Sequence, residues 1–457
     1  MMMLDLPTQI LNTLALFSPL FSQPVYKNVA ILFGGHILSK GRRTVADILR
    51  TLGLKNLKNF SRFHWIFSGA KWSAFKASRI LFFEILSVFL CNEELVIPID
   101  TTIERRKGVK IKGLGRQRDP VRSTKSRKVL TIGLQWLVAS VSIQFPGCPT
   151  RWSLPFFTQL VPPSKPLSTS KNKHDLTKKK RHKKLTDWTV QLIKTIGKWI
   201  GKKKKFVIVA DVAFATYKIG HACVSSGGAL ISRLRLDARV FNFPSEGKRR
   251  KGRPLLVGKR CPLFTEYLND STIAWQEVIT SWYGGGKKKL QIYTGTGLWY
   301  AFGIPPLPIR WVLIKDPDNK SDPIVLFSTD IHHNPERIVE IFVGRWPLEV
   351  TFEESKRHLG IETQRQWSDK AIDRTTPCIY ASFSLVVLMA AKLAKEREEK
   401  ILIQKTSWYQ KKHLTFSDLL GYVRMAILRQ KYISKFGVKG ELGKIDLEEL
   451  ISRAAAA

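Results

Sequence analysis

The first part of the chain carries apolar residues at helical spacing. Leu, Phe, Ile and Trp recur three and four residues apart through residues 58–88, which places them on one side of a helix. Thr44 is suited to cap a further helix that continues through Leu49. The polar positions include six cations, Lys40, Arg42, Arg43, Lys55, Lys58 and Arg62. We predict a helical N-terminal region over residues 1–92, which either binds DNA or merely supports the next domain.

Strand-like runs come next. Residues 94–100 and residues 206–211 are short apolar runs, and each ends in an aspartate. Residues 129–144 have the composition of a β pair and residues 229–241 alternate like a strand, whereas residues 185–200 have the period of a helix. This part of the chain therefore predicts a sheet with a helix packed on it.

The pattern changes character at about residue 242. Residues 242–308 are rich in Gly, Lys and aromatic side chains, with only short β-like runs, and we interpret them as a β-rich insertion. Core-strand composition returns in residues 309–314 and 324–327. Three helical stretches should follow, from Asn334 or Pro335 to about Leu359, from about Pro377 to Lys395, and within residues 396–457. This order predicts an α/β chain with one inserted module.

The charge of the chain indicates a polyanionic partner. Its 457 residues include 76 Lys and Arg against 36 Asp and Glu, a formal net charge of +40. A chain this basic repels itself when compact unless a polyanion such as nucleic acid neutralises it. A basic RNA-binding protein has a similar charge balance, but few such proteins also contain 44% hydrophobic residues and 13 Trp. We therefore expect a large folded core that binds nucleic acid.

The positive charge is concentrated in clusters. Between residues 165 and 205 there are fifteen Lys or Arg against two acids. The clusters are candidates for loops that contact phosphates, although each could equally be a solvated loop. They comprise residues 178–184, 202–205, 248–253 and 287–289.

Cysteines and apolar runs bear on the compartment. The five cysteines form no CxxC pair, which excludes a zinc ribbon and fits thiols in a reducing cytosol. Residues 11–21 have no basic region before them, and the apolar run at 383–389 is too short to span a bilayer. His332 and His333 have no third ligand at a suitable spacing and are interpreted as loop residues. We expect a soluble intracellular protein.

Two aspartates that follow apolar strands are candidate metal ligands. Asp100 and Asp211 each end such a run, where a carboxylate is costly unless it is paired or ligates a cation. Two of them on adjacent strand ends can share Mg²⁺, which prefers oxygen ligands and supports in-line phosphoryl transfer. An aspartate that closes a strand is also common as a helix cap or turn former. The pair alone leaves both interpretations open.

A charged helix face adds a third acid. Four charged residues occur at spacings of four, four and three, which places them on one face of a helix: Arg345, Glu349, Glu353 and Lys356. Trp346 and Val350 would pack on the opposite face. A solvated, salt-bridged surface is the ordinary alternative for such a pattern.

This spacing resembles the Y-(2)-R-(3)-E-(6)-K signature of insertion-sequence DDE transposases, the group that includes the enzyme of the Tn-five transposon. Arg345, Glu349 and Lys356 fit the signature, and Phe342 stands where the family has Tyr, so that the hydroxyl is absent. The family's first Asp commonly lies in an Asp-Thr-Thr-like strand end, as in residues 100–102, and its second ends a hydrophobic strand. The resemblance covers roughly residues 95–395. Members of the group also carry a β-rich insertion between the second Asp and the Glu.

The resemblance implies a ribonuclease H-like fold, in which a mixed sheet is flanked by helices. The first part of the catalytic core would span residues 93–241 and the second part residues 309–395, on either side of the insertion. Asp100, Asp211 and Glu349 would be the catalytic residues and would hold two Mg²⁺ ions, for which Mn²⁺ can substitute. Arg345 and Lys356 would contact DNA phosphates.

The resemblance also implies double-stranded DNA as the partner, both as transposon inverted repeats and as target. One strand would be cut at each element end, and the resulting 3′-hydroxyl would attack the target DNA. Related enzymes act as homodimers in a synaptic complex, and we expect this one in the bacterial cytoplasm at the nucleoid. In some relatives that form hairpins, an insertion Trp stacks on a flipped base.

Several interpretations remain open at this point. Trp275, Trp282 and Trp299 lie in the region that carries the stacking Trp, but large aromatic residues in a β module are more often core. The rival functions are a domesticated relative that binds DNA without cutting it, a basic RNA-binding protein, and another ribonuclease H-like nuclease such as a resolvase. All three acids are present, which disfavours the first, and resolvases are usually shorter and lack the insertion.

Overall fold

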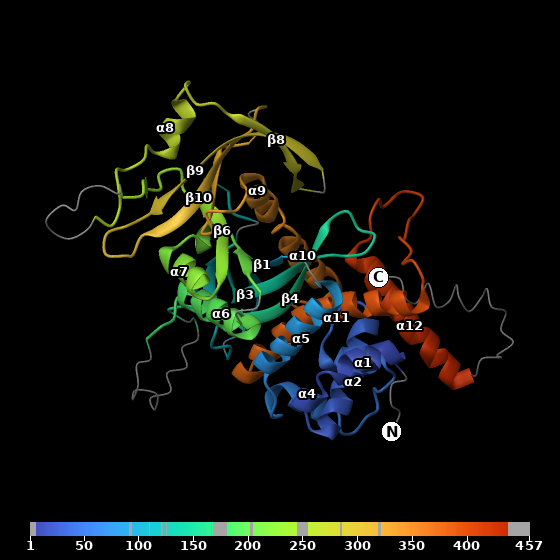
Figure 1. Ribbon diagram of the computed structural model, residues 1–457. Helices are drawn as coiled ribbons and strands as arrows, with labels where there is room; N and C mark the ends of the chain where they lie inside the picture. Colours follow the sequence, from blue (N-terminus) through green and yellow to red (C-terminus); the bar gives the residue numbers. More distant parts are fainter. Residues whose placement is uncertain are drawn as a thin grey trace.

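The computed structural model describes residues 6–90, 94–108, 110–119, 122–124, 126–165, 167, 181–201, 204–244, 255–283, 286–318 and 321–436. These residues form one mixed sheet with helices packed around it (Figure 1). The helices are α1 (Thr8–Ala15), α2 (Gln23–Leu38), α3 (Val45–Thr51), α4 (Ser61–Ser68), α5 (Ala74–Phe89), α6 (Leu185–Ile200), α7 (Tyr217–Ser225), α8 (Phe264–Asn269), α9 (Pro335–Val343), α10 (Pro347–Leu359), α11 (Asp369–Arg397) and α12 (Phe416–Phe436). The strands are β1 (Leu95–Arg105), β2 (Gly115–Arg118), β3 (Leu130–Gln144), β4 (Arg151–Leu160), β5 (Phe206–Val209), β6 (Gly228–Leu234), β7 (Val240–Phe241), β8 (Gln276–Ser281), β9 (Lys287–Trp299), β10 (Leu307–Lys315) and β11 (Ile324–Ser328).

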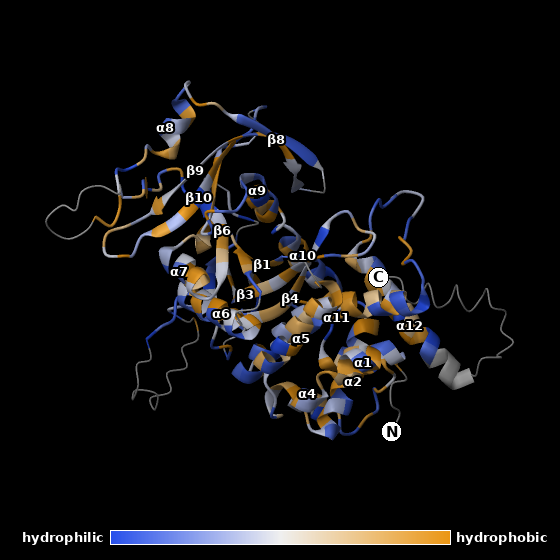
Figure 2. Cartoon of the chain, in the orientation of Figure 1, coloured by the Kyte–Doolittle hydropathy of each residue, from blue (hydrophilic) through white to orange (hydrophobic). Residues whose placement is uncertain are grey.

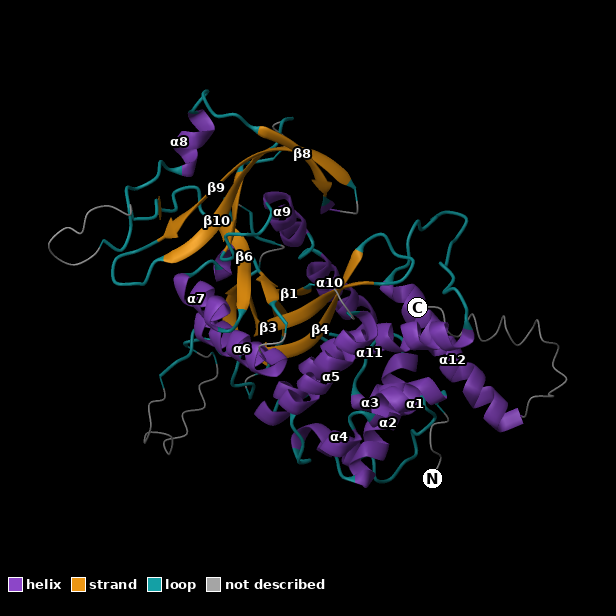
Figure 3. Cartoon of the chain, viewed as in Figure 1, coloured by secondary structure: helices purple, strands orange, loops and turns teal. Residues whose placement is uncertain are grey.

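The sheet has the order β2-β3-β1-β5-β6-β11-β10-β9-β7, with β4 paired to β3 and β8 paired to β9. Strands β1, β5 and β6 run parallel to one another, while β3 and β11 pair antiparallel to β1 and β6. Figure 3 shows β1, β3, β4 and β6 near the centre, with β8, β9 and β10 extending from them to the upper left and most helices to the lower right. The chain therefore has the mixed α/β architecture expected from its sequence, and this architecture is consistent with a ribonuclease H-like fold.

Successive residues of the central strands face two different apolar clusters. Leu95, Ile97 and Ile99 of β1 pack in a large cluster with α5 and α11, whereas Val96 packs in a second cluster with α9. The same alternation holds in β5, as expected when a strand is covered on both faces. Apolar residues accordingly line the inner sides of the helices that cover the sheet (Figure 2). The continuous apolar runs in the sequence arise because both faces of these strands are buried.

Helix α11 is the central helix of the large cluster. It begins at Asp369, eight residues before the expected start, and contains Pro377 in its interior. Its length and composition would suffice to cross a membrane, but 67% of its apolar part is buried inside the protein. This burial is typical of a core helix, and packing against β4, α5 and α12 accounts for the long apolar stretch.

The structure confirms two local predictions, the helix at residues 185–200 and the cap at Thr44, and corrects another. Helix α6 covers the expected residues, and Thr44 caps α3 by accepting a hydrogen bond from the Asp47 N–H at 3.1 Å. The expected β pair at 129–144 is instead the single long strand β3, which pairs with three neighbours. Strands β8 and β9, from the expected insertion, extend the same sheet through β10. The domain limits drawn from the sequence remain predictions.

Candidate active site

Parallel pairing of β1 and β5 brings Asp100 and Asp211 to the same edge of the sheet. Pro98 of β1 pairs with Val209 of β5, and each aspartate comes two residues later in its own chain segment. In both strands the aspartate has the same parity as the residues of the second cluster, so both carboxylates belong to the face that α9 covers. The register therefore places the two acids as neighbours.

The two aspartates differ in local structure. The expectation that Asp100 ends its strand is wrong, because β1 leaves β5 after Pro98 but stays paired with β3 as far as Arg105. Asp211 follows β5 and caps a short 3-10 turn by accepting a hydrogen bond from the Val212 N–H at 2.7 Å. Asp211 is therefore a helix cap, as the alternative interpretation proposed. The cap uses only one carboxylate oxygen, and the other oxygen can bind a second partner.

A break between α9 and α10 positions the third acid. The expected single helix from Asn334 to Leu359 is two helices, because the ring of Pro347 would clash with the carbonyl of Val343, where α9 ends. Pro347 then starts α10 at a position where its missing N–H costs nothing. Glu349 lies in the first turn of α10, where it meets Arg345 from the preceding turn.

Arg345, in the turn between the two helices, joins the acids. Its Nη1 donates to Asp100 Oδ2 at 2.6 Å and its Nη2 donates to Glu349 Oε1 at 2.8 Å. The Arg345 side chain is 11% exposed, that of Asp100 19% and that of Glu349 36%. The Arg345 guanidinium therefore connects Glu349 of α10 to Asp100, which lies 245 positions away from Arg345 in the chain.

The electrostatics of Asp100 reflect this crowding. The pKa of Asp100 is raised to about 6, mainly by burial and to a smaller extent by the carboxylates of Glu349 and Asp211, while the Arg345 guanidinium and the Thr101 N–H act to lower it. The interaction with Glu349 and Asp211 shows that the three predicted acids share one electrostatic environment. Three carboxylates of this kind need a compensating cation, and Arg345 is the cation that meets two of them here.

The donor set fits a divalent cation in chemistry but not in its present spacing. Carboxylate oxygens are the ligands that Mg²⁺ prefers, and three carboxylates surround a single positive charge. In the part of the chain that the structure describes, however, no group of three His, Cys, Asp or Glu is close enough to share one ion. The guanidinium of Arg345 occupies the space between Asp100 and Glu349, so these two acids would ligate a common ion only with Arg345 turned away.

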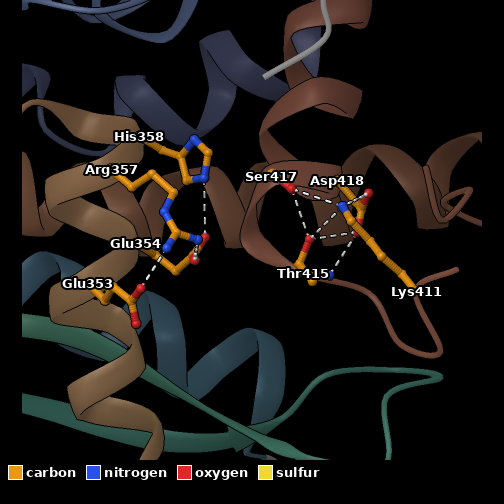
Figure 4. Close-up of polar contacts among 8 residues, drawn as sticks. All are labelled: Glu353, Glu354, Arg357, His358, Lys411, Thr415, Ser417 and Asp418. Atoms are coloured by element: carbon orange, nitrogen blue, oxygen red, sulfur yellow. Dashed lines mark hydrogen bonds and ion pairs between the residues drawn. The ribbon is translucent and has the colours of Figure 1, made fainter. Parts of the chain in front are cut away.

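The remaining signature residues point elsewhere. Lys356 lies 3.5 Å from Glu362 and contacts neither Arg345 nor Glu349. Glu353 pairs with Arg357 at the exposed side of α10, as Figure 4 shows, and is the solvated member of the predicted face. Phe342 is 7% exposed and packs in the second apolar cluster. The four charged residues therefore divide among three separate ion pairs, Arg345 with Glu349, Glu353 with Arg357 and Lys356 with Glu362, and do not form one continuous surface.

The prediction that Trp346 and Val350 are packing residues is wrong. Both are 45% exposed, and the buried face of α10 consists of Leu348, Thr351, Phe352, Ser355 and Leu359. Trp346 and Val350 instead line a cavity of about 500 Å³ between α10, the β3–β4 turn and the end of β8. Trp346 and Val350 each follow a charged residue by one position, so they lie beside the charged face and not on the buried face of α10.

The sequence reasoning missed Tyr283. This residue follows β8, packs edge-on against Trp346 with ring centroids 5.5 Å apart, and lines the same cavity. Burial raises its pKa, the Arg345 guanidinium lowers it, and the carboxylates of Glu349 and Asp211 raise it. Its phenol therefore lies within electrostatic range of the candidate site, a placement that no spacing in the sequence indicates because it depends on the β8–β9 hairpin.

The insertion tryptophans have different environments. Trp299 is 6% exposed and stacks on Tyr217 in the core, and Trp275 packs partly buried near Tyr293. Trp282 lines the same cavity as Tyr283, with the Lys288 ammonium 5.1 Å above its ring. Trp299 is thus a core residue, as is usual for large aromatic side chains. Trp282 lines the cavity that also contains Tyr283 and Trp346.

Part of the predicted basic surface can be located. Lys288 pairs with Asp316 and Lys289 with Glu277, each at 2.7 Å, so this cluster is neutralised in part by neighbouring strands. His332 and His333 lie in a turn, as expected, and His333 contacts Ser328 Oγ at 2.8 Å. Residues 178–180, 202–203 and 248–253 of the other clusters lie outside the described residues.

Comparison with known proteins identifies a family. Residues 17–290 match the family described as DDE superfamily endonuclease, which is more than half of the chain. The matched part includes Asp100 and Asp211 and ends before Glu349. No curated protein matches the chain.

Proposed function

Because this chain belongs to the DDE superfamily of endonucleases, we propose that it is a transposase, which cleaves DNA at the ends of its element and joins them to target DNA. Membership of the superfamily implies a nuclease or transposase that acts on DNA, and enzymes of this superfamily generally use divalent metal ions. The observation that carries the finer proposal is the convergence of Asp100 and Glu349 on Arg345, beside Asp211, at one sheet edge.

The spacing of the acids and cations supports the insertion-sequence group with the Y-R-E-K signature. Arg345 and Glu349 have the four-residue spacing of the signature, and this spacing lets their side chains meet in an ion pair at 2.8 Å. Lys356 lies about two helical turns beyond Glu349, its side chain is 34% exposed, and it would contact a phosphate by leaving Glu362. Both cations flank the acid at which the scissile phosphate would lie.

The proposed reaction assigns each residue a task. Asp100, Asp211 and Glu349 would hold Mg²⁺ or Mn²⁺, which supplies Lewis-acid activation of the attacking water and stabilisation of the leaving 3′-oxygen. Arg345 and Lys356 would bind the phosphates on either side of the cut and orient the scissile bond. Asp100 would hold the inner side of the ion, since its side chain is 19% exposed against 36% for Glu349.

The test is a cleavage and joining reaction. DNA that carries this gene with its native flanks should be cut at two defined positions in the presence of Mg²⁺, leave 3′-hydroxyl ends, and join to a supercoiled plasmid. A chelator should abolish both steps while leaving DNA binding in place. Binding without any cleavage under all divalent metals would support the non-cutting relative and contradict the proposal.

We expect the phenol of Tyr283 to supply the phosphate contact that Phe342 cannot make, because Phe342 has no hydroxyl. A phenol within electrostatic range of the acids can donate a hydrogen bond to a phosphate, and hydrogen bonds to charged groups contribute about 1.5–3 kcal/mol. Tyr283→Phe should therefore lower single-turnover cleavage at limiting DNA by about tenfold, with an unchanged melting temperature because the ring stays on Trp346. Tyr409→Phe, at a residue 63% exposed and outside this cavity, is the matched control. Equal rates for the two variants would remove Tyr283 from the site.

A further inference from the structure

A second groove lies at the far end of β1. It has a volume of about 970 Å³ and is formed by the end of β1, the start of β3 and the segment between α10 and α11. Since a strand rises about 3.3 Å per residue, Arg105 is roughly 17 Å from Asp100 along β1. Neither the signature nor the predicted basic clusters includes this groove.

Several cations that line the groove have no acidic partner. Among the described residues, Lys107, Lys110 and Arg365 have no carboxylate partner, whereas the lining acid Glu362 lies 3.6 Å from Arg105 and 3.5 Å from Lys356. Clustered cations in a concave surface attract an anionic ligand. Glu362 also connects the groove to the signature cation at the end of α10.

Exposed apolar surface accompanies this charge. Trp367 is 58% exposed, with the Lys110 ammonium 5.3 Å above its ring, and Leu130 and Ile132 on the opposite wall are 54% and 44% exposed. Large apolar side chains gathered in one groove indicate a ligand with an apolar face. Phosphate alone would not require them.

Three buried polar atoms of the lining have no hydrogen-bond partner within the described residues. They are Arg105 Nε, Gln364 Oε1 and Gln366 Oε1. Gln364 is only 3% exposed, and its amide nitrogen is held by Thr376. The main chain of Gln366 is fixed as well, because its carbonyl accepts a hydrogen bond from Arg106. Buried groups of this kind are costly unless a ligand or water satisfies them.

One residue of the groove lining, Glu362, has a strained backbone. Glu362 has φ +74°, in the left-handed region that non-glycine residues rarely adopt. The Arg105 N–H donates to the Glu362 carboxylate at 3.1 Å and holds it there. Strain of this kind is commonly retained at binding sites.

We propose that this groove binds single-stranded DNA, with a base stacked on Trp367, its edge toward Gln364 and Gln366, and the adjoining phosphates on Lys107, Lys110 and Arg365. The combination of an exposed aromatic side chain with cations that have no carboxylate partner is the arrangement that proteins use for unpaired nucleotides. A duplex would not satisfy it, because its base faces are already stacked. The inference rests on the proposed function only in taking the nucleic acid to be DNA, and it would provide for a strand that separates from the duplex near the cut.

The test compares single-stranded and duplex DNA of the same sequence. Binding of the full chain is followed by fluorescence anisotropy of a labelled oligonucleotide, with chelator present so that no cleavage occurs. Stacking on one aromatic residue contributes about 1–3 kcal/mol, so Trp367→Ala should weaken single-strand binding by about tenfold and duplex binding much less. Trp367→Phe should keep most of the affinity.

Trp408→Ala is the matched control, since Trp408 is 86% exposed and does not line the groove. An oligonucleotide with a photoreactive base should crosslink to the peptide that contains residues 365–367. The inference is overturned if Trp367→Ala binds single strands like Trp408→Ala, or if it loses duplex and single-strand binding equally. If Trp367→Ala selectively loses single-strand binding but the parent protein never cuts DNA, the proposed transposase activity is refuted and the single-strand site is supported.

Discussion

Asp211→Asn should abolish DNA cleavage while leaving the fold and DNA binding close to those of the parent protein. The side chain of Asp211 caps the turn at Val212 with one oxygen, and asparagine caps such turns equally well. The substitution removes only the negative charge and one metal-binding oxygen. Since metal activation supplies several kcal/mol, and each 1.36 kcal/mol is a tenfold change in rate, we expect a loss of about a thousandfold.

This substitution separates the two interpretations that the sequence left open. If Asp211 were only a cap, the asparagine variant would cut DNA at the parent rate. Glu349→Gln should show the same loss as Asp211→Asn, and Glu353→Gln one turn further along α10 should show none, because Glu353 pairs with Arg357 at the surface. Single-turnover cleavage with excess protein measures all three, and active Asp211→Asn protein would refute the triad.

The sequence predicted the parts of the site that depend on local pattern. The apolar runs before Asp100 and Asp211 identified two strands, and their parallel pairing in the structure places the acids side by side. The sequence placed a helix start at Asn334 or Pro335, and in the structure Asn334 caps α9 by accepting a hydrogen bond from the Glu336 N–H at 2.8 Å. Such features are encoded within a few residues of one another.

What the sequence did not predict depends on contacts between distant segments. Strand β1 continues past Asp100 because β3 pairs with it, and α11 begins eight residues before Pro377 and contains this proline in its interior. Tyr283 reaches the site only through the β8–β9 hairpin. The bridge from Arg345 to Asp100 spans 245 residues, and no spacing rule for one helix could anticipate it.

Arg345 should control how strongly the acids respond to a divalent ion. In the structure its guanidinium takes the position between Asp100 and Glu349 that a shared ion would occupy. Removing one partner of a buried ion pair typically costs about 3–5 kcal/mol. Glu349 is about one-third exposed and screened by solvent, so we expect Arg345→Ala to be less stable by about 2 kcal/mol in the presence of chelator.

Excess Mg²⁺ should then reverse this loss. An ion that binds only the folded state stabilises it in proportion to its affinity, and three carboxylates without a competing guanidinium should bind it more tightly. The rise in melting temperature on adding Mg²⁺ should therefore be larger for Arg345→Ala than for the parent protein, even though the variant cuts DNA more slowly because it has lost a phosphate contact. Arg337→Ala removes a surface pair with Glu94 and Glu340 and should change neither quantity. A smaller Mg²⁺ response in Arg345→Ala than in the parent would mean that Arg345 organises the acids for the ion and does not compete with it.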